Sequence, residues 1–236
     1  MDGFSYTNIF ETKGIEYLTI IAFFAVLVPF WFIVSRKPKR KVAATGSNQI
    51  ISAASLRIPQ GIFFSKFHTW AHMEESGNAK VGLDDLLVHI TGDVEISQLK
   101  SPAEYIEKGE VLAVLRYNGN SLKILSPISG EIENINSTLN ENPEIIRADP
   151  YRLGWIYAIK PTNWKAETNS YFLAEDATTW AVQELKRFKD FLAISASATM
   201  PQPVGVILQD GGELMEKPLA EFPQEIWDDF QKNFLS

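Results

Sequence analysis

The sequence predicts a β-rich α+β protein that begins with a single transmembrane helix, and three observations support this prediction. Short runs of alternating apolar residues, separated by Gly, Pro, Asn and Asp, indicate β-strands. An uncharged apolar segment near the N-terminus has the length of a membrane-spanning helix. Towards the C-terminus, apolar residues recur at spacings of three and four, which is typical of amphipathic helices. With 236 residues, the chain is long enough for one domain with extensions.

Residues 15–34 are the predicted transmembrane helix, preceded by a short extracytoplasmic segment, residues 1–14. From Tyr17 to Val34 the sequence contains no charged residue, and about 20 apolar residues span a bilayer core. A cleaved signal peptide is an alternative. It fits poorly, because the N-terminus lacks a basic region and no small-residue cleavage site directly follows Val34. A buried helix of a globular protein is the other alternative.

A basic cluster directly follows this segment. With it begins the predicted segment of residues 35–55, a basic stop-transfer sequence followed by a flexible linker. The cluster consists of Arg36, Lys37, Lys39, Arg40 and Lys41. The positive-inside rule then predicts that the N-terminus lies outside a bacterial inner membrane and the domain in the cytoplasm. Removing these five positive charges from the net charge of −7 leaves −12 on the rest, which argues against nucleic-acid binding.

Residues 110–132 predict a strand, a tight turn, a second strand, another turn and a third strand. Asn118-Gly119 between alternating apolar residues is the signal of a type I′ hairpin, which needs positive φ at both central residues. Lys123 lies between Leu122 and Ile124 on the second strand, so strand alternation points its side chain to solvent.

Several motifs in the segment from Lys66 to Lys160 resemble, in order, those of the glycine cleavage H protein, a lipoyl carrier. They are His68-Thr69-Trp70, Val81-Gly82-Leu83-Asp84, Gly92-Asp93-Val94, Lys108-Gly109-Glu110, Ser126-Pro127-Ile128-Ser129-Gly130-Glu131, Asn142-Pro143-Glu144, Asp149-Pro150-Tyr151 and Gly154-Trp155. The resemblance implies that residues 56–165 form an H-protein-like β-sandwich of the barrel-sandwich hybrid type.

The resemblance also implies where a cofactor would be attached. In this family the lipoylated lysine stands at the hairpin tip, and counting back from Ser126 places that position on Gly119. Glycine cannot carry lipoate, so no cofactor is expected. Modification of Lys123, which requires a shifted hairpin register, is the alternative.

Two helices are predicted after the β-rich domain: an amphipathic helix at residues 175–196 and a short aromatic helix within the tail, residues 197–236. Their apolar faces either pack against the domain or bind protein subunits of a membrane complex. The residues proposed for such contacts are Trp180, Phe188, Trp227, Phe230 and Phe234. We expect at least one of the two faces to bind another subunit.

Catalytic and metal-binding motifs are weak in this sequence. There is no cysteine, which excludes disulfides and thiolate metal sites. His68 and His72 have a metal-pair spacing only if they lie on a helix, and their surroundings predict a strand. Asp84 and Asp85 are paired carboxylates, and their position after Gly82 predicts that they cap a helix or turn the chain; acid–base chemistry is the alternative.

The sequence therefore favours a protein that is not an enzyme. The preferred hypothesis is a membrane-anchored, H-protein-like domain without lipoate, which acts as a non-catalytic scaffold or accessory subunit of a membrane complex. The alternative is a functional lipoyl or aminomethyl carrier of a glycine-cleavage-like system, modified at another lysine.

Overall fold

The computed structural model describes residues 9–35, 50–199, 208–209 and 213–236. The chain divides into two compact units, Met1–Thr45 and Gly46–Ser236.

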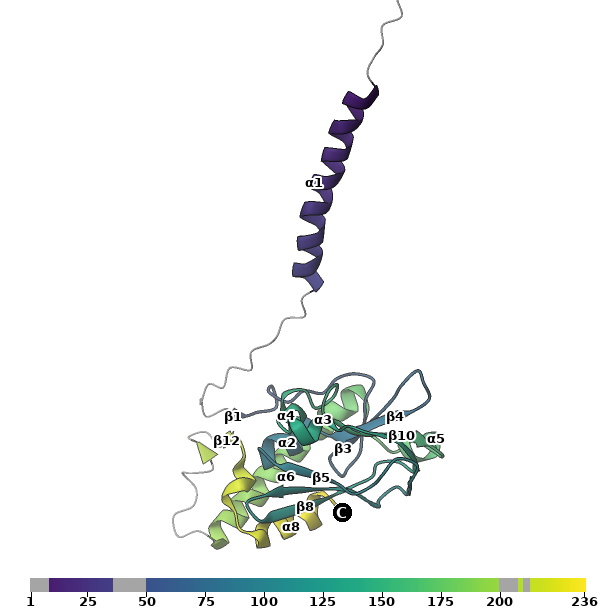
Figure 1. Ribbon diagram of the computed structural model, residues 1–236. Helices are drawn as coiled ribbons and strands as arrows, with labels where there is room; N and C mark the ends of the chain where they lie inside the picture. Colours follow the sequence, from purple (N-terminus) through teal and green to yellow (C-terminus); the bar gives the residue numbers. More distant parts are fainter. Residues whose placement is uncertain (1–8, 36–49, 200–207, 210–212) are drawn as a thin grey trace, which may run out of the picture. The chain divides into compact units, whose positions relative to one another are not determined.

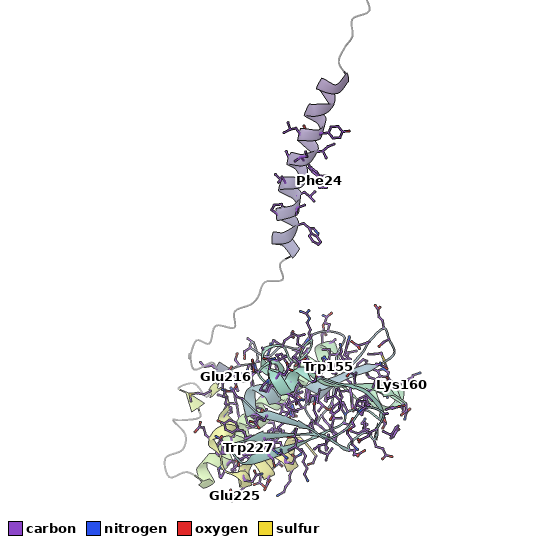
Figure 2. The ribbon with its side chains drawn as sticks, viewed as in Figure 1. Phe24, Trp155, Lys160, Glu216, Glu225 and Trp227 are labelled. Atoms are coloured by element: carbon purple, nitrogen blue, oxygen red, sulfur yellow. The ribbon has the colours of Figure 1, made fainter. Side chains whose placement is uncertain are left out.

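The described residues of the first unit form the helix α1 (Ile9–Ser35; Figure 1). Side chains on this helix, such as Phe24, are exposed (Figure 2). Among the described residues, no helix is long and apolar enough to cross a membrane. The predicted transmembrane helix is therefore wrong, and so is the single-pass location in a bacterial inner membrane with the N-terminus outside. The basic cluster behind the topology prediction lies outside the described residues.

The second unit is β-rich, as predicted, and its largest sheet has six strands in the order β2-β3-β4-β10-β9-β6, with every neighbouring pair antiparallel. Its strands are β2 (Phe63–Phe64), β3 (Thr69–Met73), β4 (Ala79–Leu83), β6 (Tyr105–Ile106), β9 (Gly130–Ile135) and β10 (Trp155–Pro161). Four consecutive residues of β10, Ile156 to Ile159, are buried in the core. Gly82 of β4 is required for packing, since a Cβ there would lie 2.7 Å from the ring of Trp70.

A second sheet holds the hairpin and has the order β5-β7-β8. Its strands are β5 (Glu95–Gln98), β7 (Val111–Tyr117) and β8 (Asn120–Leu125). Leu122 and Ile124 of β8 are buried, whereas Ser121 and Lys123 are exposed. This alternation confirms the predicted orientation of Lys123.

A small third sheet joins the segment before the domain to the C-terminal tail. Its order is β1-β12-β11, so Ile50 pairs with Met215 and Ile51 with Leu214. The strands are β1 (Ile50–Ile51), β11 (Leu208–Gln209) and β12 (Glu213–Met215). Residues 50–51, placed by sequence in a flexible linker, thus belong to a sheet.

Besides the strands, the described residues of the second unit form short helices and two longer ones. The short helices are α2 (Asp85–Thr91), α3 (Thr138–Glu141), α4 (Ile145–Ala148), α5 (Trp164–Thr168) and the 3₁₀ helix η1 (Pro218–Glu221). The longer ones are α6 (Ala174–Thr199) and α8 (Gln224–Phe234), which occupy the two predicted helical segments (Figure 1). Both bury their apolar faces against the β-rich core, in one cluster with residues of β4, β7 and β8.

Candidate functional site at the β7–β8 hairpin

The hairpin tip has the predicted turn geometry. Asn118 has φ of 46° and Gly119 has φ of 88°, and Tyr117 pairs with Asn120 across the turn. Two consecutive positive φ values define the primed turns that match the twist of a hairpin. No described atom lies within 4 Å of the Cβ that a larger residue at Gly119 would carry, so the space around the tip is open.

A hollow of about 420 Å³ lies beside this tip. It is lined by Asp93, Glu95, Arg116, Tyr117, Asn118, Gly119, Asn120 and Ser121. Most of its lining is polar, and it carries charges of both signs. Such a surface differs from the mostly apolar pockets that hold small cofactors.

The outer edge of β8 is closed by polar side chains of α8. The side chain of Gln231 accepts a hydrogen bond from the Lys123 N–H at 2.6 Å and donates one to the Lys123 carbonyl at 3.1 Å. Gln224 Oε1 accepts from the Ser121 N–H at 3.1 Å, and Asn120 Nδ2 donates to the Phe222 carbonyl at 3.2 Å. An exposed strand edge invites pairing with other chains, and here the protein's own C-terminal helix takes that place.

Trp227 fixes α8 against the hairpin. Its ring stacks on Tyr117, the last residue of β7, with centroids 6.4 Å apart and planes 4° apart. Its indole N–H donates to the Leu219 carbonyl at 2.9 Å, and the side chain is fully buried (Figure 2). Burying a large ring with its polar atom satisfied stabilises the helix in this position.

The turn after β8, Ser126–Gly130, is held by α5. Glu167 accepts hydrogen bonds from the Ser129 N–H at 2.7 Å and from its hydroxyl at 2.6 Å. Tyr171 donates to the Pro127 carbonyl, and Lys108 lies over the Tyr171 ring at 4.5 Å. Burial lowers the pKa of Lys108, and burial raises the pKa of Tyr171. These contacts hold the turn that follows β8 in position.

His68 forms a buried charged row with two carboxylates. Its Nδ1 lies 2.8 Å from Asp84 Oδ2, and its Nε2 lies 3.7 Å from Glu184 Oε2 on α6. Burial by itself lowers the pKa of His68, but Asp84 and Glu184 outweigh it and raise the pKa to about 9. Arg187 binds both oxygens of Glu184, at 2.7 and 2.9 Å. The row therefore ties the β-rich core to α6.

Arg187 connects this row of charged side chains to the C-terminal end of α8. Its guanidinium lies 4.2 Å from the ring centroid of Phe234 and donates to the Asn233 carbonyl. Burial alone would raise the pKa of Glu184, but His68 and Arg187 together lower it. The C-terminal end of α8 is thus linked through charged groups to the interior of the domain.

Asp84 and Asp85 begin α2, as the capping interpretation predicts. Asp84 Oδ1 accepts from the Leu87 N–H at 2.8 Å, which caps the helix. Asp85 accepts from the backbone N–H of Arg57 at 2.9 Å and from its Nε at 2.8 Å. Burial would raise the pKa of Asp85, but His89 and Arg57 lower it. The role of Arg57, far away in sequence, carries no local signal.

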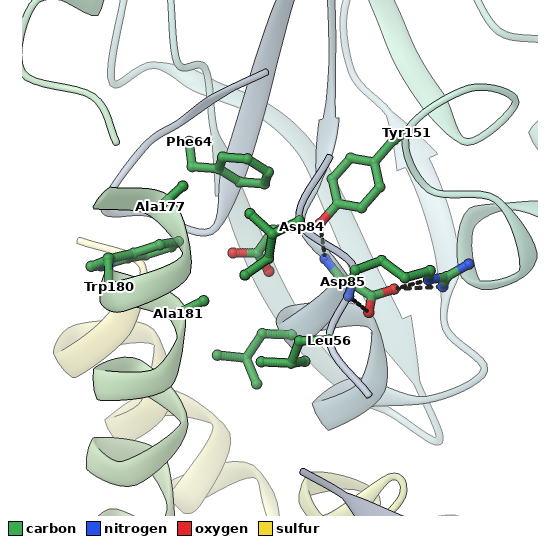
Figure 3. A pocket seen from close by; sticks show the side chains of 11 residues that line it. Leu56, Phe64, Asp84, Asp85, Tyr151, Ala177, Trp180 and Ala181 are labelled. Carbon is green, nitrogen blue, oxygen red and sulfur yellow. Dashed lines mark hydrogen bonds and ion pairs between the residues drawn. The ribbon is translucent and has the colours of Figure 1, made fainter. Parts of the chain in front are cut away.

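A small cavity lies next to these carboxylates. Its volume is about 10 Å³, which is room for about one water molecule. Figure 3 shows Tyr151 and Asp85 on one side and Ala177, Trp180 and Ala181 of α6 on the other. A cavity of this size cannot hold a cofactor.

The histidines are not brought together. His68 is buried, whereas His72 lies on strand β3, is exposed and approaches the Gly61 carbonyl at 3.1 Å. His89 lies 3.2 Å from Glu216 and 3.4 Å from Asp85. Within the described residues, no three His, Asp or Glu side chains are arranged to hold a metal ion.

The five aromatic side chains proposed for partner contacts all lie in the interior of this chain. Phe188, Phe230 and Phe234 pack edge-to-face or stacked, with centroids 4.8 to 5.9 Å apart. Trp180 stacks on Phe172 at 4.9 Å, and Trp227 stacks on Tyr117. The intramolecular packing that the sequence left open therefore accounts for the burial of all five.

Comparison with known proteins agrees with this architecture. The family model "Glycine cleavage H-protein" matches residues 62–184. A probable glycine cleavage system H protein of Pyrococcus abyssi is 32% identical over 126 residues, which cover 53% of this chain and 93% of that protein. The glycine cleavage system H protein of Thermus thermophilus is 36% identical over 104 residues, covering 44% of this chain and 80% of that protein.

A third relative points the same way. The H protein of Stenotrophomonas maltophilia is 33% identical over 126 residues, covering 53% of this chain and 95% of that protein. A crystal structure of an H protein from Mycobacterium marinum is 27% identical and covers 44% of this chain and 87% of that chain; at a TM-score of 0.42, it adds no weight of its own. On the family match and the curated relatives, the chain belongs to the glycine cleavage H-protein family.

Proposed function

We propose that this chain is a non-catalytic accessory member of the H-protein family, which carries no lipoyl group and works by binding other proteins. The observation that carries the proposal is the hairpin tip. Gly119, which the motif spacing aligns with the lipoyl lysine, has φ of 88° in a compact turn. A glycine offers no amine to which lipoate could be attached.

The surroundings of the hairpin support the proposal. The helix α8 is hydrogen-bonded along the outer edge of β8. The stack of Trp227 on Tyr117 adds a rigid contact directly beside the turn. These contacts fix the hairpin in one place, which suits a binding scaffold.

A carrier modified at Lys123 is the second candidate, and one observation favours it. The Lys123 side chain is exposed, so an enzyme could reach it. Its backbone, however, is held in the middle of β8 by Gln231 and not at a turn. Lipoylation there would place the cargo on the strand beside α8.

Mass spectrometry of the protein purified from its native host tests both candidates. The proposed function expects the mass of the unmodified chain. A lipoyl group on any lysine contradicts it, and peptide mapping then shows whether Lys123 is the modified residue.

A further inference from the structure

The β5-β7-β8 sheet has two outer edges that differ in their hydrogen bonding. The order of the sheet makes β5 and β8 its edge strands. On β8 the outward groups of Ser121 and Lys123 are bonded by Gln224 and Gln231. The part of the chain that the structure describes gives the edge of β5 no comparable cover.

The register of β5 identifies which of its backbone groups point outward. Ile96 pairs with Leu115 and Gln98 with Ala113, and the Leu99 N–H continues the ladder by donating to the Leu112 carbonyl. In an antiparallel ladder only alternate residues exchange hydrogen bonds with the partner strand. Since Leu99 does so, the N–H and C=O groups of Ile96 and Gln98 face away from β7.

These outward groups of Ile96 and Gln98 have no backbone or side-chain partner among the residues that the structure describes. The Gln98 side chain points elsewhere, since its Nε2 lies 3.2 Å from the Asn136 carbonyl. Backbone groups on a strand edge are satisfied most fully by a second extended backbone. The unpaired edge is thus a template for one more strand.

Charge indicates what kind of strand this edge accepts. Glu95 opens β5, is exposed, and makes no ion pair with any described residue. Asp93, two residues earlier, already has Arg147 and Lys217 as partners. Both acidic residues line the hollow beside the hairpin tip, together with Arg116, which donates a hydrogen bond to the Ser97 hydroxyl at 2.9 Å. An added strand that continues past Glu95 reaches that hollow.

We propose that the edge of β5 binds an extended segment of a partner protein, with a Lys or Arg of that segment paired to Glu95. The proposal rests on the proposed function, because it names how a binding scaffold would hold its partner. The partner strand bonds the outward groups of Ile96 and Gln98, and the hollow at the tip receives its basic side chain. Because α8 already occupies the outer edge of β8, the partner strand binds at the edge of β5.

The test uses the full-length protein and two synthetic probes. One is an octapeptide of alternating Lys and Val, and the other replaces each Lys with Glu. Binding is measured by fluorescence anisotropy, and amide hydrogen exchange locates it. The expected result is that the Lys peptide slows exchange at Ile96 and Gln98, while the Glu peptide does not.

A matched pair of variants isolates the backbone contact. Gln98→Ala removes the side-chain bonds and keeps the outward N–H, whereas Gln98→Pro also removes the N–H, which faces away from the ladder with β7. Gln98→Pro should bind the Lys peptide at least about threefold more weakly than Gln98→Ala, the loss expected for one net hydrogen bond. Glu95→Gln should also weaken binding.

Three results would overturn the proposal: equal binding by the two Gln98 variants, protection confined to β8 or α8, or protection of Ile96 and Gln98 that grows with protein concentration without peptide. The last result would assign the edge to a second copy of this chain. Lipoate found on the native protein would contradict the proposed function instead, and it would leave the peptide result unchanged.

Discussion

Gln231 satisfies both backbone hydrogen-bonding groups of Lys123, as a neighbouring strand would. Its side-chain oxygen lies 2.6 Å from the Lys123 nitrogen and its side-chain nitrogen 3.1 Å from the Lys123 oxygen. A primary amide has the donor and the acceptor that this imitation requires. Through this pair, the last helix of the chain protects the outer edge of the hairpin.

Replacing Gln231 by Met keeps the length of the side chain and removes both hydrogen-bonding groups. We expect the free energy of unfolding to fall by about 0.5–1.5 kcal/mol, because water at this exposed site replaces part of what is lost. Amide exchange at Lys123 should accelerate, as measured by mass spectrometry. Lys232→Ala, one residue further along α8, is the control and should leave that exchange unchanged. Equal exchange in both variants would show that the edge is protected by other contacts.

Replacing Gly119 by Val tests the turn. No described atom crowds this position, so the whole cost comes from the positive φ of 88°. A β-branched residue in that region should lower the free energy of unfolding by about 1 kcal/mol or more. Gly119→Asn is the matched variant, since Asn tolerates this backbone region best among residues with a side chain. If both variants melt together with the unchanged protein, the tip does not hold the turn described.

Trp227→Ala should be among the most damaging single changes to the domain. The side chain is fully buried and contacts Leu219 of η1 and Tyr117 of β7, and removing a large buried ring costs about 3–5 kcal/mol. Chemical denaturation of the purified protein measures the loss. A chain that ends after Pro223 should unfold for the same reason. A stable truncated protein would contradict the account of α8 as part of the core.

Raising the pH should weaken the attachment of α6. His68 has a pKa of about 9 in the folded protein and about 6.5 in an unfolded chain. Its stabilising contribution is therefore complete below about pH 6.5 and is lost as the pH rises through 9. Asp84 and Glu184 face the ring directly, and Arg187 faces Glu184. The melting temperature should fall between about pH 7 and about pH 9.5.

His68→Asn provides the comparison for this pH dependence. His68 has φ of 58°, a backbone region that Asn adopts readily, so the substitution removes the charge with little backbone strain. The variant should be less stable than the unchanged protein at neutral pH. Its melting temperature should fall much less as the pH is raised above neutral. His72→Asn, at an exposed position, should retain the decline. A decline of the same size in His68→Asn would assign it to other groups.

The β-rich domain was predictable because its signals are local. The Asn118-Gly119 pair specifies a turn through the backbone alone, and the alternation around Lys123 specifies which side chains face water. The periodicity of α6 and α8 was equally visible. The surface against which these helices pack could not be predicted. Trp227 contacts Tyr117, which is far away in sequence, and no local pattern encodes that contact.

Two further features could not be predicted from the sequence: the hydrogen bonds between α8 and the outer edge of β8, and the buried row of charged side chains around His68. Gln224 and Gln231 are seven residues apart and share a helix face, which was the only signal of their role. The pairing of His68 with Glu184 depends on a long-range contact with α6. The length and uncharged apolar composition of residues 15–34 led to the transmembrane prediction, and the basic cluster after them led to the predicted orientation. Among the described residues no helix is long and apolar enough to cross a membrane, so that prediction is wrong.

The intact mass of the protein from its native host tests the central claim most directly. The claim is that the hairpin of this H-protein family member carries no lipoyl group, because Gly119 stands at its tip. We expect the mass of the unmodified chain, with no lipoylated peptide after digestion. A lipoyl group on Lys123, or on any other lysine, would contradict it.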